Sequence, residues 1–260
     1  MGSQLTEYEK KIAFGFSWQS PSHYYIPKAM DIDDAVFSFR QGIPKFSSRT
    51  LNTLESIGTT DIDAKIIIEY GKGVESLTTM QIRTIENFGQ ACGCLFELVK
   101  NKQWKMDKKT ICFLHSILSR DEVRNPGLFR QTPVIIDGCT YTPPKHTVLN
   151  DLFSSGISAL SGIPSIPERA LVSFLFLSRS QFFENCNKRT ASLVMAGTLI
   201  SNGYKSLHVD AYPKEFLRSM ADFYDSADAT KIIALFNAMA KEQYPDFLPS
   251  DERHFKNDGI

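Results

Sequence analysis

Apolar residues recur at helical spacing along most of this chain, and that periodicity constrains the fold more than any other feature of the sequence. Residues 78–101 carry an apolar residue every three or four positions: Ile82, Ile85, Phe88, Cys92, Leu95, Phe96 and Val99. Related patterns fall in residues 59–73, 105–120, 146–160, 167–180, 191–204, 211–224 and 228–243. A shorter helix is expected after Asp31, ending before Pro44. The spacing therefore predicts a mostly α-helical fold.

One stretch departs from this pattern and predicts a β-hairpin. Val134, Ile135 and Ile136 form a short β-branched run, and Asp137-Gly138 is a strong signal for a hairpin turn. The chain is expected to return through Tyr141 and to leave the pairing at Pro143-Pro144, because proline cannot donate to a ladder.

Length and charge set the broad class. The chain has 260 residues, with 29 basic and 29 acidic side chains, which suits one large domain or a domain with a helical extension. Balanced charge gives no support for nucleic acid or an anionic membrane as a partner. No apolar run is long enough to span a membrane, and five unevenly spaced cysteines form no disulfide framework. We expect a cytoplasmic protein; the oligomeric state is left open.

Residues 181–190, QFFENCNKRT, place small polar groups and two cations just before a helix. A helix N-terminus has unpaired N–H groups and a partial positive charge, so it can hold an anion. Asn187 can add an amide donor, and Arg189 a planar fork suited to phosphate. Lys188 can add a point charge or face solvent. The alternative interpretation is an ordinary capped helix with solvated cations.

The order of these segments resembles the Fic (Fido) superfamily, whose signature is His-Pro-Phe-x-Asp/Glu-Gly-Asn-Gly/Lys-Arg. PGLFRQTPVIIDGCTYTPP resembles the family's flap hairpin, and the helices on either side of the decapeptide also match. The resemblance covers roughly residues 50 to 240. It implies a Fic-type helical core with a β-hairpin flap, and transfer of AMP from ATP to a hydroxyl of a target protein. ATP and Mg²⁺ are the cofactors that it implies.

The resemblance assigns roles to individual residues. Phe183 matches the buried motif Phe, while Asn187 and Arg189 match the residues that hold phosphate. Cys186 and Lys188 complete the implied phosphate-binding turn. The flap, Val134 to Tyr141, is where a target protein would pair by strand addition.

Several positions depart from the family pattern. Gln181 stands where the family has its His, the general base, and an amide cannot accept a proton at neutral pH. Asn185 replaces the acidic magnesium ligand, and Cys186 replaces the glycine beside the phosphate. Ser192 replaces the second Arg that many members carry. Glu184, one place away, is a doubtful substitute as metal ligand or base.

An inhibitory helix is a feature of many family members, and residues 50–60 match it in part. Glu55 falls at the inhibitory position, but its family partner is the second Arg, here Ser192. A solvated helix residue is the alternative reading of Glu55. We therefore expect an N-terminal extension with helices in residues 1–100, a Fic-like core in 101–245 and a tail in 246–260.

Three functions remain open from the sequence, and the near-intact turn of Asn187, Lys188 and Arg189 argues against the third, a structural or partner subunit that binds no nucleotide. In the first, the chain is a degenerate Fic-like protein, a pseudoenzyme that keeps a phosphate- or nucleotide-binding loop and meets a protein partner through its flap. In the second, it is an active, divergent protein adenylyltransferase that uses ATP and magnesium. Four altered positions in one site favour the first, although a phosphoryl-type transfer can survive the loss of a base.

Overall fold

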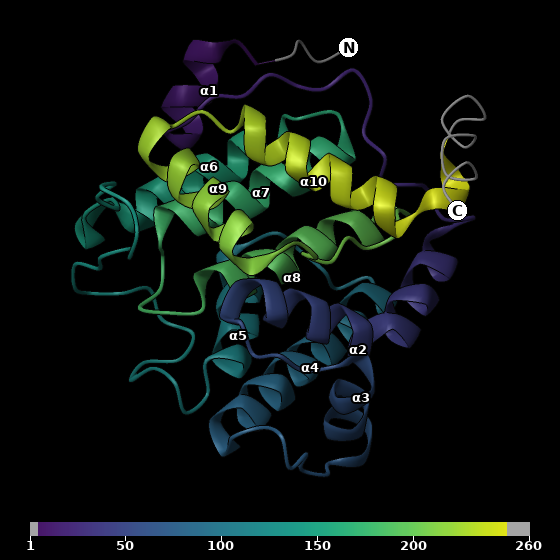
Figure 1. Cartoon of the computed structure of the whole chain (residues 1–260). Coiled ribbons are helices and arrows are strands. Elements are labelled where there is room, and N and C mark those ends of the chain that lie inside the picture. The colour runs from purple at the N-terminus through teal and green to yellow at the C-terminus, as the bar shows by residue number, and fades with distance from the viewer. Residues whose placement is uncertain (1–4, 249–260) are drawn as a thin grey trace.

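The computed structural model describes residues 5–248, and within them the chain is mostly helical (Figure 1). The helices are α1 (Glu7–Phe14), α2 (Ile32–Glu55), α3 (Asp61–Tyr70), α4 (Thr79–Lys100), α5 (Lys108–Leu118), α6 (Leu149–Ser161), α7 (Ile166–Ser180), α8 (Asn187–Ile200), α9 (Pro213–Ser226) and α10 (Thr230–Gln243), with short 3-10 turns at His146–Val148 and Pro245–Phe247. No described helix is both long and apolar enough to cross a membrane.

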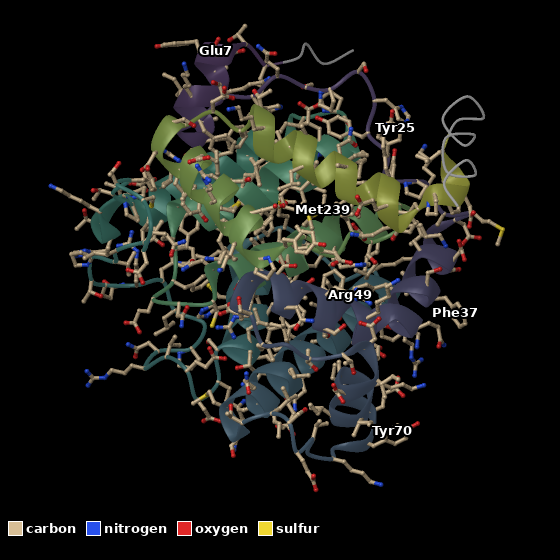
Figure 2. The ribbon with its side chains drawn as sticks, viewed as in Figure 1. Glu7, Tyr25, Phe37, Arg49, Tyr70 and Met239 are labelled. Carbon is tan, nitrogen blue, oxygen red and sulfur yellow. The ribbon has the colours of Figure 1, made fainter. Side chains whose placement is uncertain are left out.

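Helix α8 lies in the middle of the molecule, between two groups of helices (Figure 1). One face of α8, including Val194 and Leu199, packs into an apolar cluster with α7, α9 and α10. The other face, including Leu193 and Ile200, packs into a second cluster with α2, α4 and α5. Exposed side chains such as Phe37 lie at the periphery (Figure 2). The turn that enters α8 is therefore held by both halves of the core.

Helix α2 is longer than the sequence predicts. Asp31 caps it, since the Asp31 carboxylate accepts from the backbone N–H of Asp34 at 2.7 Å, but the helix continues through Pro44 to Glu55. A proline inside a helix removes one backbone hydrogen bond and costs about 3 kcal/mol. Here the apolar face of α2 is buried on both sides of Pro44, and that burial outweighs the local cost. The prediction of a helix ending before Pro44 is wrong.

The predicted β-hairpin is not confirmed as a paired structure. Residues 131–145 contain the predicted turn, with Gly138 at φ 82°, but no strand is assigned among the described residues. The returning backbone bonds to a side chain instead: Asp225 of α9 accepts from the N–H groups of Thr140 and Tyr141, each at 2.8 Å. These two backbone N–H groups, which a hairpin would use to pair its strands, are therefore bonded to α9 instead.

Residues 131–145 include the predicted flap, and the name flap is used for this whole segment from here on. The segment is fastened at its base. The buried guanidinium of Arg130 donates to the carbonyl oxygen of Thr132 at 2.8 Å and to that of Pro144. It also donates to the carbonyl oxygen of Gln181 at 2.6 Å, which joins the flap to the turn before α8. The tip stays open, and the side chain of Ile135 is 90% exposed.

Replacing Asp225 tests this description of the flap. Asp225→Ala should raise the hydrogen-exchange rates of the Thr140 and Tyr141 amides about tenfold or more, because both donors lose their acceptor. Asp222→Ala, an exposed neighbour on α9, serves as the control and should leave both rates unchanged. Protection that persists in Asp225→Ala would mean that the two amides are held by strand pairing after all.

Candidate functional site

The turn between α7 and α8, which we call the motif loop (residues 181–186), has a left-handed residue at each end. Gln181 has φ 50° and Cys186 has φ 59°. An L-residue in this conformation costs about 1 kcal/mol, which explains why a glycine would suit the Cys186 position. Cys186 keeps the turn despite its side chain. Burial raises the pKa of the Cys186 thiol to about 12, so it is a thiol and not a nucleophilic thiolate.

Asn187 closes the motif loop from inside. Its amide nitrogen donates to the Gln181 side-chain oxygen and to the Phe183 carbonyl, each at 2.9 Å, and its oxygen accepts from the Phe183 N–H at 3.0 Å. The Gln181 nitrogen donates to the Ser178 carbonyl at 2.6 Å. Both ends of the Gln181 amide are therefore bonded to residues of α7 and α8 that flank the loop, and Asn187 holds the loop's shape.

His115 of α5 supports the loop from below. It is fully buried and its ring stacks on Phe183, with 3.7 Å between centroids. Its Nδ1 lies 2.9 Å from the N–H of Gly127 and so accepts, which leaves Nε2–H to donate to the Asn185 carbonyl at 3.2 Å. Burial lowers the pKa of His115 to about 4. The contact between His115 and the motif loop joins residues 70 positions apart, which local sequence spacing does not reveal.

Arg189, in the first turn of α8, forms a buried ion pair. Its side chain is 2% exposed, and its two terminal nitrogens bond to the two carboxylate oxygens of Glu122 at 2.7 and 2.6 Å. Burial alone would lower the pKa of Arg189, but the Glu122 carboxylate raises it above the ordinary value. Burial would likewise raise the pKa of Glu122, and the Arg189 hydrogen bonds lower it instead. This is a buried, bidentate ion pair.

Glu55 also approaches Arg189, from the last turn of α2. Its Oε1 lies 3.0 Å from Arg189 Nε, although the N–H is not aligned for a hydrogen bond. The expectation that Glu55 lacks a cationic partner, because Ser192 replaces the second arginine, is therefore wrong: Arg189 lies beside Glu55 instead. Ser192 itself is buried and donates to the Lys188 carbonyl at 3.0 Å.

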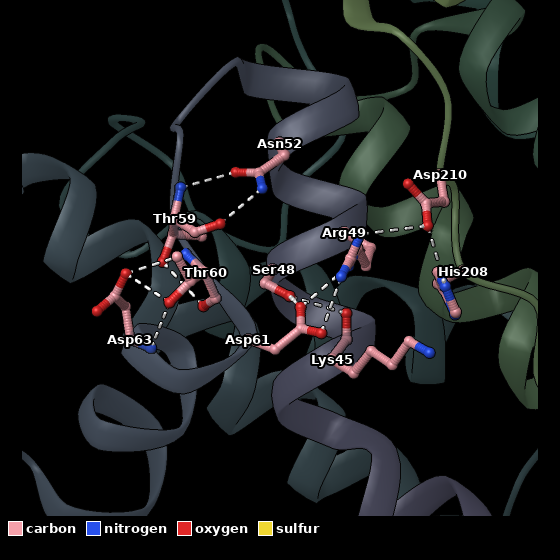
Figure 3. Close-up of polar contacts among 10 residues, drawn as sticks. All are labelled: Lys45, Ser48, Arg49, Asn52, Thr59, Thr60, Asp61, Asp63, His208 and Asp210. Atoms are coloured by element: carbon pink, nitrogen blue, oxygen red, sulfur yellow. Dashed lines mark hydrogen bonds and ion pairs between the residues drawn. The ribbon is translucent and has the colours of Figure 1, made fainter.

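The end of α2 that carries Glu55 is fixed by polar contacts (Figure 3). The Asn52 side chain donates to the carbonyl of Thr59 at 2.7 Å and accepts from its N–H at 2.9 Å, which closes the turn after the helix. One turn earlier, Arg49 forms a two-pronged pair with Asp61 at 3.0 and 3.1 Å and lies 3.8 Å from Asp210. The approach of Glu55 to Arg189 thus follows from a braced helix end.

The remaining residues predicted for the site lie around the loop without forming a metal centre. Lys188 is half-buried, and burial lowers its pKa. Glu184 is exposed, while the Asn185 side-chain oxygen accepts from the Cys186 N–H at 2.7 Å. Within residues 5–248, no group of three or more His, Cys, Asp or Glu side chains is placed to hold a metal ion.

Two residues that organise the site escaped the sequence analysis. Glu122 lies in the loop after α5, 67 positions before Arg189 in the sequence, and no local spacing links them. Arg130 was read only as part of the flap pattern, whereas its guanidinium joins flap and motif loop. A buried arginine requires a carboxylate or several carbonyls, but the sequence does not reveal which ones.

The buried His115 predicts a pH dependence of stability. Its pKa is near 6.5 when unfolded and about 4 when folded, so its contribution is complete above pH 6.5 and declines as pH falls toward 4. The free energy of unfolding should fall by about 2 kcal/mol between pH 7.5 and pH 5 from this residue. His115→Gln, which can keep both hydrogen bonds, should lose that part of the slope in denaturant titrations. His23→Gln, at an exposed histidine, should retain it.

Comparison with known proteins places the fold. No protein-family model matches the sequence, and no curated protein sequence matches it. Solved structures do match: a Fic domain containing signaling protein from Bacteroides thetaiotaomicron aligns at TM-score 0.63 and 15% identity, over 86% of this chain and 89% of that one. Fic-1 from C. elegans (a fragment) aligns at TM-score 0.66 and 14% identity, over 83% and 70%.

A third match is IbpAFic2, solved in complex with adenylylated Cdc42, at TM-score 0.57 and 15% identity, over 84% of this chain and 67% of that one. These likenesses span helices of both apolar clusters, since they cover more than four fifths of the chain. The predicted resemblance is confirmed at the level of fold: this chain is a divergent protein with the Fic fold.

Proposed function

We propose that this chain is a Fic-fold protein that has lost AMP transfer and works by presenting its flap to a protein partner. One observation carries the first half: the Gln181 side chain, at the position of the family's general base, is hydrogen-bonded at both ends inside the motif loop. An amide in that setting cannot take a proton from a target hydroxyl.

No neighbouring group is placed to act as the base instead. Both ring nitrogens of His115 are used in hydrogen bonds, and its lowered pKa opposes protonation at neutral pH. Glu122 is paired with Arg189 and has a lowered pKa, so it is a weak proton acceptor. Glu184 belongs to the motif loop, but its side chain is exposed to solvent. These contacts support loss of the chemistry.

The residues that would hold ATP and magnesium also do not fit them in this arrangement. The side-chain amide of Asn187 is already hydrogen-bonded to the backbone of Phe183, and Arg189 is paired with two carboxylates. Asn185 is a neutral ligand already accepting a backbone N–H. We infer that nucleotide binding is weak or requires rearrangement of the site.

The flap supports the second half of the proposal. Arg130 fastens its base and Asp225 its returning segment, so fewer residues have to be ordered when a partner binds. The exposed Ile135 side chain offers an apolar anchor for a partner. IbpAFic2, a structural relative, was solved with the protein Cdc42, which supports a protein as the class of partner.

An AMP-transfer assay tests the proposed loss of activity. Purified protein incubated with α-labelled ATP, Mg²⁺ or Mn²⁺ and a cell extract should incorporate no label into itself or into any other protein. Label that appears with the wild type and disappears with Arg189→Ala would overturn the proposal in favour of an active, divergent adenylyltransferase.

A second variant identifies what silenced the site. Gln181→His combined with Asn185→Asp and Cys186→Gly restores the base, the acidic ligand and the left-handed glycine. Gain of labelling would attribute the loss of activity to these three positions. We expect only weak gain, because Arg189 stays paired with Glu122 in this variant.

A further inference from the structure

The loop between α5 and the flap carries an acid that no motif singled out. Glu122 presents both carboxylate oxygens to both terminal nitrogens of Arg189, at 2.7 and 2.6 Å. Arginine binds two phosphate oxygens with the same planar fork. The carboxylate therefore occupies the face of Arg189 that a phosphate would use, and the two anions cannot share it.

The surroundings of Glu122 resemble a built anion site. Its side chain is 12% exposed, Thr84 Oγ1 donates to it at 3.3 Å, and the Cys186 thiol lies 3.8 Å from its second oxygen. Arg189 is 2% exposed and so depends on this anion, since a buried guanidinium without a counter-charge is strongly unfavourable. Glu55 is a weaker candidate for the same role, because its contact is unaligned and its side chain is 33% exposed.

The loop that carries Glu122 is attached at points that could release it. Asp121 has φ 66° and pairs with Arg83 at 3.0 Å, where both side chains are about half exposed. Arg120 accepts from Asn87 at 2.9 Å through its carbonyl, and Gly127 donates to His115. Surface pairs of the Arg83 kind contribute little, so the inner contacts of Glu122 hold most of the loop's position.

We propose that Glu122 is an internal anion that closes the arginine site, and that a phosphate-bearing ligand binds to Arg189 only in exchange for it. This rests on the Fic-fold assignment of Arg189 as a phosphate-binding residue. It assigns the closure to the loop after α5 and not to the end of α2. The exchange conserves the charge pairing of Arg189, since one anion leaves as another enters.

Chemical rescue tests the proposal. Glu122→Ala removes the internal anion and should lower the melting temperature. Acetate, pyrophosphate or ATP added to this variant should raise it again by about 3 °C or more, saturably, because each supplies an anion to Arg189 in the folded state. Asp121→Ala, which removes the neighbouring carboxylate of the same loop, should show no such response, and neither should the wild type.

Calorimetric titration gives the second readout. Pyrophosphate should bind Glu122→Ala at least about tenfold more tightly than the wild type, while Glu55→Ala should stay close to the wild type. ATP in place of pyrophosphate distinguishes a nucleotide from a free phosphate as the ligand. If Glu122→Ala does not fold, Glu122→Gln keeps the volume and the acceptor, and the same comparison applies.

Two results would overturn the proposal. One is equal pyrophosphate affinity, or equal lack of it, in the wild type and in the Glu122 variants. The other is tight binding by Glu55→Ala alone. Either result leaves the proposed loss of AMP transfer untouched, because that is read from labelling by the wild type; label incorporated by the wild type would in turn leave the affinity comparison valid.

Discussion

The guanidinium of Arg189 is buried in the first turn of α8, and the other contacts of the site depend on how its charge is balanced. Taking the charge of Arg189 out of water is costly unless a matching anion goes with it. Glu122 supplies that anion with ideal fork geometry, and Glu55 adds to the negative field from the opposite side. Helix α2, helix α8 and the loop after α5, which carry these three residues, are thereby joined at one point between the two apolar clusters.

Polar side chains of the motif loop are also hydrogen-bonded within the protein. Two polar side chains of the loop meet partners within the protein: Gln181 bonds to Asn187, and Asn185 bonds to the backbone of Cys186. His115 fixes the loop from below through a neutral ring. These contacts stabilise the shape of the loop itself. The same side chains are then not available to bind a nucleotide.

The sequence predicted the helices and the family fold because both rest on regular spacing and on a local motif. It failed where long-range contacts decide. Pro44 was read as a helix end, but burial of the α2 face on both sides of it prevails. The flap was read as a hairpin from its Asp-Gly turn, but Asp225, 85 residues beyond Thr140, takes the backbone donors. Glu122 could not be found at all, because nothing in its neighbourhood marks it as the partner of Arg189.

The departures from the family motif and the ion pair of Arg189 have a common physical explanation. Under the proposed function, Gln181 supplies no base, so an open phosphate site would give no catalytic advantage, and an unpaired Arg189 would only destabilise the core. A carboxylate that fills the site removes that penalty and ties the loop after α5 to α8. What remains accessible is the flap, whose two fastenings, Arg130 and Asp225, do not involve the ion pair. Partner binding through the flap and closure of the arginine site can therefore coexist in one folded state.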